Sequence, residues 1–452
     1  MMYHNNKAMI AIFFLFISIV VQNTTSCKID LNSNKIEWKL CQSQNINNLK
    51  HISFNKFLNT TTYQDECFPA IVPGTALISM LNNNMFPGIS DLFHDEDLNK
   101  IPDIYNNSGM YTFFWRAQIH NVTQLISKCN SNNNNNNNIP SISTLKSTAY
   151  VHIRSLNYRA SFFQNGKEIM PINVNNNKAA VGMFHRWKYP INIDSSSMVS
   201  FAILISPPDY VGKPNCGQGG DHEIAKNAAI MQYTAGWDWA RATPDRNTGL
   251  WDLVELEVFH DHIISLINPH IKIKTNITSN VPPSIVNIDI ATSIFSQLND
   301  NDDIRYILRA TVVETMEHVE TTPFKISSNN TNVKLPSLSM KSPKLWFPHT
   351  HYDGPNLYTM QLELFHYDEK SLLLIDKNLK TSPLTEMSIK FGIRTFTTYV
   401  DTDVTDGRVF LCNGEKIFIQ GGNWIGTDQF LRYSTSSERY HNEILLHKQM
   451  VK

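Results

Sequence analysis

The chain has 452 residues, a formal net charge of −1 and a pI near 7.0. This length is more than one hydrophobic core usually supports, so the sequence predicts several domains. Binders of nucleic acid or of anionic membranes need an excess of basic residues, and the nearly balanced charge argues against both classes.

The N-terminus has the layout of a secretory signal peptide. Lys7 precedes an apolar run from Ala8 to Val21, and small residues follow up to Ser26. The run is shorter than the ~20 apolar residues that a membrane span requires, although an uncleaved signal anchor is the alternative. We therefore assign residues 1–26 to a signal peptide. We expect an extracellular or lysosomal protein with no further membrane segment.

Passage through the secretory pathway gives meaning to the sequons and the cysteines. Glycosylation would mark the sequons as surface loops, and they lie at Asn59, Asn106, Asn121, Asn276 and Asn329. The cysteines lack CxxC spacing, which argues against a zinc cluster. One or two disulfides are expected, with Cys27, Cys41 and Cys67 as favoured candidates and no fixed connectivity.

Hydrophobic patterning predicts a mainly β chain. Between Trp38 and Val400, short runs rich in Val, Ile, Phe and Tyr recur, and helical periodicity is rare. In "LVELEV" (residues 253–258), Val254, Leu256 and Val258 point to one face and the intervening residues to the other. This alternation is typical of a half-buried antiparallel strand, and many such strands between turns predict β-sandwiches.

Two asparagine-rich tracts interrupt this pattern at residues 130–140 and 173–180. Both are polar and lack apolar periodicity, so we predict expanded loops there.

The pattern changes near Arg408. "RVFLCNGEKIFIQGGNW" predicts two strands joined by an Asn-Gly hairpin turn. "TSSERYHNEILLHKQMVK" predicts a helix that begins with a capping box of Thr435 and Glu438. Its expected apolar stripe consists of Tyr440, Ile444 and Val451, with Leu445 beside it. A buried strand that leads into a helix is the usual start of a β/α-repeat domain.

The segment "QYTAGWDWARATPDRNTGLWDLVEL" (residues 232–256) does not resemble ordinary core. Three tryptophans share it with charged residues, and Asp238 lies between Trp237 and Trp239. Within it, "PDRNTG" predicts a turn ahead of the next strand. The roles expected there are bonds to nearby backbone amides for Asp245 and Asn247, and structural ion pairs for Arg246 and Asp252.

Several of these pieces follow one another as they do in glycoside hydrolase family 2. They are "GWDWARATPDRNTGLWD", "LWFPHTHYDGPNLY", "FGIRTF" and "FLCNGEKIFIQGGNWIGTDQF". The chain is similar to the branch of exo-β-D-glucosaminidase and mannosylglycoprotein endo-β-mannosidase, which "VPGTALISML", "FPGISDLF" and "YTFFWR" also resemble. The resemblance covers nearly everything after the signal peptide and concerns the family's N-terminal portion only. Gly426 departs from it, because a proline is usual there.

The resemblance implies an architecture of three parts. These are a galactose-binding-like jelly-roll sandwich at residues 27–262, an immunoglobulin-like sandwich at 263–396, and the first βα unit of a truncated (β/α)8 catalytic barrel at 397–452. It implies a retaining β-glycosidase acting on β-mannosides or β-glucosaminides of glycans, with a glycan or oligosaccharide as partner and no cofactor.

A retaining mechanism needs two carboxyl groups about 5 to 5.5 Å apart. The family takes both from later barrel strands, and no residue of this chain matches either. The acid/base and the nucleophile are therefore expected beyond Lys452, and the chain by itself is expected to be inactive.

The resemblance also implies substrate-binding residues. In the family, the loop matching "GWDW" reaches over the barrel mouth, which makes Asp238 a candidate ligand for sugar hydroxyls. Trp237 and Trp239 would wall the pocket, although buried packing is an equal alternative for both indoles. "GGNW" ends the first barrel strand, so Asn423 and Trp424 are expected at the rim of the site. We favour a sugar platform over a core position for Trp424.

For other polar residues we expect structural roles and no direct part in function. His349, His351 and Asp353 imitate a metal site but lack a supporting shell, so no metal is expected. Asp428 is expected to cap a local turn. Two other functions stay open: a non-catalytic carbohydrate-binding protein built from the two sandwiches, and, less favoured, a cell-surface adhesion protein.

The signal peptide generates the first prediction. The short apolar run and the small residues after it predict cleavage near Ser26. N-terminal sequencing of the secreted protein should therefore start near residue 27, and a secreted protein that retains Met1 would contradict the assignment.

Overall fold

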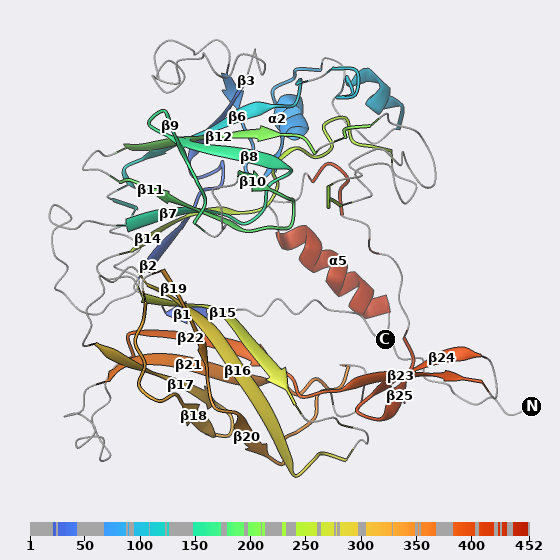
Figure 1. Ribbon diagram of the computed structural model, residues 1–452. Coiled ribbons are helices and arrows are strands. Elements are labelled where there is room, and N and C mark those ends of the chain that lie inside the picture. The colour runs from blue at the N-terminus through green and yellow to red at the C-terminus, as the bar shows by residue number, and fades with distance from the viewer. Residues whose placement is uncertain are drawn as a thin grey trace, which may run out of the picture. The chain divides into compact units, whose positions relative to one another are not determined.

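The computed structural model of the chain divides into two compact units (Figure 1). The large unit comprises residues 26–260 and 424–452, and the small unit comprises residues 1–25 and 261–423. The residues that the structure describes are 21–23, 26–42, 67–86, 89, 95–107, 109–122, 124–125, 148–172, 179–193, 198–208, 210–212, 228–231, 241–259, 264–274, 277, 281–296, 304–327, 329–348, 351, 354–367, 383–402, 406–419, 424, 427–431 and 437–450.

The large unit is built mainly from strands. They are β2 (Ser26–Asp30), β3 (Glu37–Gln42), β4 (Cys67–Pro69), β5 (Gly74–Thr75), β6 (Phe113–His120), β7 (Thr148–Ile153), β8 (Arg159–Gln164), β9 (Lys167–Ile169), β10 (Ala180–Val181), β11 (Trp187–Ile191), β12 (Met198–Ser206), β13 (Gly249–Leu250) and β14 (Val254–Phe259). Within the described residues, one sheet has the order β10-β8-β12-β6-β3-β4, with β9 on β8, and a second has the order β11-β7-β14-β2.

These two sheets pack face to face, as the separate layers of β12, β6 and β8 and of β7, β11 and β14 in Figure 1 show. The Phe162 ring on β8 stacks on the Tyr189 ring on β11 at a centroid distance of 4.5 Å. Trp115 on β6 is fully buried between the layers. Aromatic residues bury large apolar areas, so these contacts explain why the aromatic-rich runs of the sequence became strands of one core.

The predicted alternation in β14 is confirmed. Val254, Leu256 and Val258 have no exposed surface and belong to the core. β14 pairs antiparallel with β2 and with β7, which makes it a central strand. One outward-facing residue departs from the pattern, because Glu257 is only 4% exposed.

Glu257 is surrounded by basic side chains from other strands of its sheet. Its carboxylate lies 2.6 Å from Nε2 of His152, 3.2 Å from Nζ of Lys188 and 3.8 Å from Nζ of Lys28. Burial alone raises the pKa of Glu257, but the hydrogen bond with His152 and the charge of Lys188 outweigh it and lower the pKa to about 2.

A single disulfide is present among the described cysteines. Cys41 on β3 is bonded to Cys67 on β4, with an S–S distance of 2.03 Å. This confirms the prediction of a disulfide within the N-terminal group of cysteines. Cys412 is a buried free thiol.

The helices are few, as predicted. In the large unit the structure has α2 (Ala76–Asn82), the 3-10 helix η3 (Asp95–Lys100) and α5 (Ser437–Met450). α2 was not predicted, because most of its residues are buried and it therefore shows no amphipathic stripe. Thr75 caps it, since its hydroxyl accepts a hydrogen bond from the amide of Ile78. In the part of the chain that the structure describes, no helix has both the length and the apolar character needed to cross a bilayer.

The predicted C-terminal helix is confirmed as α5, but its predicted apolar stripe is only half-buried. Tyr440 and Ile444 are partly covered, and Leu445 is 40% exposed. Thr435 of the capping box and Val451 of the stripe lie outside the described residues. The greater burial of Tyr440 and Ile444 than of Leu445 agrees with the predicted stripe within the described helix.

The small unit is also made of strands. They are β1 (Val21–Asn23), β15 (Ile264–Ile273), β16 (Ile285–Ser296), β17 (Arg305–Val312), β18 (His318–Glu320), β19 (Asn329–Lys334), β20 (Leu338–Lys341), β21 (Tyr358–Tyr367), β22 (Thr385–Phe391), β23 (Phe396–Asp401), β24 (Gly407–Cys412) and β25 (Glu415–Ile417). Among the described strands, the sheet orders are β1-β22-β21-β17-β18, then β15-β16-β19 with β20 on β16, then β23-β24-β25.

The first two of these sheets share one core. Leu308 on β17 and Leu362 on β21 come from one sheet, and Ile288 and Ile290 on β16 come from the other. All four are at most 1% exposed. β17 and β21 alternate buried and half-buried residues along most of their length, so the period-two runs again explain the fold. The prediction of a mainly β chain is confirmed.

The Asn-Gly hairpin is confirmed in the third sheet. β24 and β25 pair across Asn413 and Gly414, which have φ angles of 53° and 82°. Positive φ at both positions is what a tight hairpin turn of this kind requires, and asparagine and glycine tolerate it best.

Some expected features fall outside the described residues. Most of both asparagine-rich tracts is not described. β1 lies within the segment assigned to the signal peptide and pairs with residues 386–388 of β22. The signal peptide remains a prediction from the sequence.

The Glu257 cluster generates a pH prediction. Because the pKa of this carboxylate falls from 4.5 to about 2 on folding, it stabilises the fold above pH 4.5 and loses this contribution as the pH falls to about 2. Glu257→Gln should cost about 3 kcal/mol of unfolding free energy at pH 5 to 6, at about 1.4 kcal/mol per pKa unit, and much less near pH 2. Denaturant unfolding followed across this pH range measures the difference.

Glu255→Gln on the same strand is the matched control, because Glu255 is more exposed than Glu257. It should change the unfolding free energy little at any pH. A Glu257→Gln penalty that does not shrink below pH 4.5 would refute the ion-pair explanation.

Candidate functional site

The structure describes only part of the predicted substrate-binding set. Trp237, Asp238 and Trp239 fall in residues 232–240, which lie outside the described residues, and so does Asn423. Trp424 is described. The residues on either side of segment 232–240, at 228–231 and 241–259, are described.

The predicted sequons are distributed in the same way. Asn59 and Asn276 lie outside the described residues, and Asn329 begins β19. Asn106 and Asn121 are exposed, so their side chains are open to modification.

The residues that follow the tryptophan-rich segment in the sequence form a buried polar turn. Five of the six residues at 243–248 are polar, and each of these is at most 1% exposed: Thr243, Asp245, Arg246, Asn247 and Thr248. The amide of Arg246 donates to the carbonyl of Thr243 at 2.9 Å, and that of Thr248 donates to Asp245 at 3.0 Å. This confirms the predicted turn.

The backbone of this turn is unusual. Arg246 and Asn247 have φ angles of 50° and 55°, which non-glycine residues rarely adopt. Such conformations persist where surrounding contacts over-determine them. Here the side-chain contacts of Asp245, Arg246 and Asn247 hold the backbone in this conformation.

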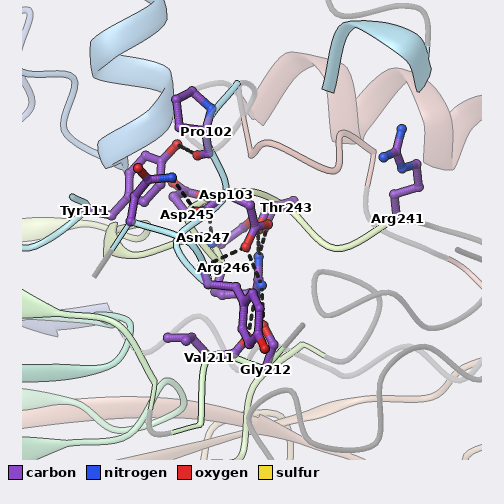
Figure 2. A network of polar contacts seen from close by, with 12 residues as sticks. Pro102, Asp103, Tyr111, Val211, Gly212, Arg241, Thr243, Asp245, Arg246 and Asn247 are labelled. Atoms are coloured by element: carbon purple, nitrogen blue, oxygen red, sulfur yellow. Dashed lines mark hydrogen bonds and ion pairs between the residues drawn. The ribbon is translucent and has the colours of Figure 1, made fainter. Parts of the chain in front are cut away.

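Arg246 has every guanidinium donor satisfied in the protein interior (Figure 2). Two parallel bonds of 2.7 and 2.9 Å join it to both carboxylate oxygens of Asp103. The other three N–H groups donate to the backbone carbonyls of Thr243 at 2.7 Å, of Val211 at 2.9 Å and of Gly212 at 3.0 Å. A guanidinium has five donors, so none is left unpaired in this fully buried side chain.

Asp245 ties the turn to α2. One carboxylate oxygen accepts from the amide of Leu77 at 3.0 Å, and the other accepts from the amide of Asn247 at 2.8 Å. The predicted role of Asp245 is confirmed. Full burial raises the pKa of Asp245, and this effect outweighs the opposing effects of the two amides and of the charge of Arg246. The resulting pKa is about 6. Because the folded pKa lies above 3.8, the buried carboxylate costs stability above about pH 6, and that cost disappears below pH 4.

The predicted role of Asn247 was wrong. Its side chain does not bond a nearby backbone amide: Oδ1 accepts from the hydroxyl of Thr243 at 2.6 Å, and Nδ2 donates to the carbonyl of Gln429 at 3.0 Å. Burial leaves no water for the asparagine amide, so it pairs with partners that the fold brings close.

Asn157, which is fully buried, is bonded to the backbone of the same turn. Its Nδ2 donates to the carbonyls of Arg246 and Asn247 at 2.7 and 3.1 Å. Gly249 follows, with a φ of 152°, and a Cβ there would meet the carbonyl oxygen of Gly74 at 2.6 Å. A side chain at Gly249 would therefore separate β13 from β5.

The segment after "GGNW" meets the segment after "GWDW". Besides the bond from Asn247 to Gln429, the side-chain amide of Gln429 donates to the carbonyl of Arg241. Phe430 is buried in the large unit's core. Asp428 caps the local turn as predicted, because its carboxylate accepts from the amide of Phe430 at 2.8 Å. Two segments far apart in the sequence are thus in direct contact.

Trp424 lies at the start of this second segment. It is 53% exposed, and its ring stacks on His447 of α5 at 5.7 Å. Thr427 donates to Glu443 of the same helix at 2.6 Å. Trp424 is therefore not a core residue.

The ion pairs expected for this region are present. Arg246 pairs with Asp103, and Asp252 pairs with Arg154 at 3.3 Å. The second pair is much more exposed than the first.

The histidine cluster is a structural contact where it is described. His351 is bonded through Nε2 to Glu415 at 2.8 Å and stacks on Phe347 at 4.0 Å. His349 and Asp353 lie outside the described residues. The described part of the chain contains no group of three or more His, Cys, Asp or Glu that could hold a metal ion.

Residues 266–377 match the family model "Glycosyl hydrolases family 2". The predicted resemblance to this family is confirmed.

Curated relatives extend the resemblance. Mannosylglycoprotein endo-beta-mannosidase of Lilium longiflorum is 29% identical over 84% of this chain, and Beta-mannosidase B of Aspergillus fumigatus is 26% identical over 49% of it. The chain spans only 36% and 23% of the lengths of these two proteins. The similarity therefore covers only a part of each relative.

A solved structure supports the fold. The exo-chitosanase CsxA of Amycolatopsis orientalis matches 90% of this chain and 38% of its own, with a TM-score of 0.56 and 15% identity. This likeness supports the fold alone.

The Arg246 network generates a stability prediction. Asp103→Ala leaves a buried guanidinium charge without its carboxylate, and losing one partner of a buried pair typically costs about 3–5 kcal/mol. We expect the large unit to unfold at a clearly lower denaturant concentration, as followed by tryptophan fluorescence.

Asp252→Ala is the matched control, because it removes a carboxylate from a half-exposed ion pair. Its cost should stay below about 1 kcal/mol. Equal effects of the two substitutions would show that the buried pair has no special role.

Proposed function

We propose that this chain forms the substrate-binding N-terminal portion of a retaining β-glycosidase that acts on β-mannosides or β-glucosaminides of glycans. The convergence of the segments that follow "GWDW" and "GGNW" carries this proposal. Two motifs that the resemblance assigns to one sugar site are flanked by residues in direct contact, through Asn247, Gln429 and Arg241. The similarity to a mannosylglycoprotein endo-β-mannosidase over most of the chain supports the substrate class.

The proposed architecture follows the family. Residues 27–262 would form a galactose-binding-like jelly-roll, residues 263–396 an immunoglobulin-like sandwich, and residues 397–452 the start of a (β/α)8 barrel. The face-to-face sheets of each unit support the two sandwich assignments. We expect the catalytic acid/base and nucleophile beyond Lys452, on later barrel strands.

In this proposal, Asp238 is the ligand of the terminal sugar. A carboxylate accepts hydrogen bonds from two neighbouring hydroxyls of a pyranose, which orients the ring. Trp237 and Trp239 would wall the pocket. The buried turn at residues 243–248 supports this role, because a segment that is anchored at one end can hold a carboxylate more precisely.

Asn423 and Trp424 would complete the rim. The exposure of Trp424 and its stacking on His447 support a platform role for this indole, since a half-exposed aromatic face can pack against the apolar face of a sugar. The enzyme would act in the secretory pathway, extracellular or lysosomal, with glycans at its exposed sequons.

The proposal predicts a specific kinetic defect. In the protein encoded by the complete gene, Asp238→Asn should lower kcat/KM on aryl β-mannosides or β-glucosaminides by roughly tenfold to a hundredfold or more, because hydrogen bonds to a charged acceptor contribute about 1.5–3 kcal/mol each. The 452-residue chain alone should show no turnover.

Asp252→Asn is the control, since this nearby carboxylate pairs with Arg154. It should leave kcat/KM within about twofold, as expected for a partly exposed ion pair. If Asp238→Asn hydrolysed both substrates at the unsubstituted rate, Asp238 would not be the sugar ligand. No hydrolysis by the complete protein would favour a non-catalytic carbohydrate-binding role.

A further inference from the structure

A polar cavity lies beside the Arg246 network in the large unit. Its volume is about 290 Å³, near the lower end of the range of small-molecule sites. The polar groups on its wall come from two segments far apart in the sequence, and they are Asn99, Asp103, Asn106, Asn107 and Arg241. Apolar surface is supplied by Leu98, Ile101, Pro102, Ala242 and Pro244.

We propose that this cavity binds a single pyranose residue. A pyranose has hydroxyls around its edge and C–H groups on its faces, so its site needs amide and guanidinium groups together with apolar rings. Asn99, Asn107 and Arg241 supply the first kind of group, and Pro102 and Pro244 supply the second. The proposal deepens the proposed glycosidase function and rests on it, because Arg241 directly follows the tryptophan-rich loop.

The wall is held in place before any ligand binds. Pro102 accepts a 2.7 Å hydrogen bond from the hydroxyl of Tyr111, and the amide of Ile104 donates to the carbonyl of Pro244 at 3.1 Å. Asp103 is fixed by its two bonds to Arg246. A site whose groups are already ordered loses less conformational freedom on binding.

Arg241 is the charged hydrogen-bond donor on the cavity wall that a sugar hydroxyl would contact. Its Nη2 donates to Oδ1 of Asn99 at 2.7 Å, which holds the guanidinium at the wall, and Figure 2 shows Arg241 apart from the cluster around Arg246. Arg241 and Asn99 belong to the two different segments of the chain that line the cavity, and both are at least partly exposed. Substituting them should therefore change binding without unfolding the unit.

Two sources can supply the pyranose. One is an oligosaccharide substrate, of which this cavity would hold a unit near the tryptophan-rich loop. The other is the chain's own glycan, because Asn106 is a sequon asparagine, is exposed and lies on the cavity wall. The chemistry recognised is the same in both cases.

Binding to the unglycosylated 452-residue chain tests the site. Saturation-transfer NMR and titration calorimetry would use methyl β-D-mannopyranoside, glucosamine and N-acetylglucosamine as probes. We expect millimolar binding of at least one probe. Arg241→Gln should weaken it at least about tenfold, as expected for the loss of a charged hydrogen-bond donor. Arg154→Gln, which alters an arginine that pairs with Asp252, should leave it unchanged.

The chain secreted from a glycosylating host distinguishes the two sources. If the Asn106 glycan fills the cavity, mass spectrometry should find Asn106 occupied, probe binding should disappear, and Asn106→Gln should restore it. If the source is an external oligosaccharide, the glycosylated chain should bind the probe as the unglycosylated chain does. Both results support a pyranose site.

The inference fails if none of the three probes binds the unglycosylated chain, or if Arg241→Gln and Asn99→Ala both bind as tightly as the unsubstituted chain. This failure is separable from that of the proposed function. Hydrolysis that depends on Asp238 with no binding in the cavity would refute this inference only. Binding that depends on Arg241, without hydrolysis by the complete protein, would refute the proposed catalysis only.

Discussion

The ion pair between Arg246 and Asp103 is the interaction on which the described site depends. A guanidinium with no solvent exposure is costly unless its charge is compensated and all of its N–H groups are bonded. Here one carboxylate and three carbonyls, from Thr243, Val211 and Gly212, meet that requirement. The same bonds hold Arg246 and Asn247 at positive φ. The turn is stable because several separate segments fix it at once.

The residue that follows the segment 232–240 in the sequence is held on two sides. It is Arg241, whose carbonyl accepts a hydrogen bond from Gln429 and whose side chain donates to Asn99. A sugar-binding carboxylate must be held within a fraction of an ångström of its productive position. Under the proposed function, the buried turn would supply that precision to Asp238, and its contact with Gln429 would bring the "GGNW" motif toward the same sugar site. The cavity beside Asp103 would extend the same surface by one sugar.

Much of the fold could be predicted from the sequence because it is encoded locally. The alternation of Val254, Leu256 and Val258 identifies β14, and Asn413-Gly414 identifies the hairpin of β24 and β25. α2 escaped prediction because a short helix buried on most sides has no stripe to detect. Glu257 was assigned correctly to the outer face of its sheet, but it is covered by two lysines and a histidine from three other strands.

The polar site could be predicted only in part, because most of its contacts join residues that are far apart in the sequence. Chemical type indicated an ion pair for Arg246, but its partner Asp103 is 143 residues away, and no local pattern points to it. Asn247 was assigned to neighbouring amides because turns usually use asparagine in that way. In the fold its donor reaches Gln429, 182 residues further along the chain. Asn157, which supports the same turn, gave no signal in the sequence at all.

Hydrogen exchange at the amides of residues 241–250 tests the central claim most directly. If the Arg246–Asp103 pair fixes the turn, the amides of Arg246, Thr248 and Gly249 should be among the slowest to exchange in the large unit. Asp103→Asn should accelerate them strongly while leaving the exchange of β17 and β21 in the small unit unchanged. Fast exchange of the turn in the unsubstituted protein, or exchange that Asp103→Asn does not alter, would contradict the account.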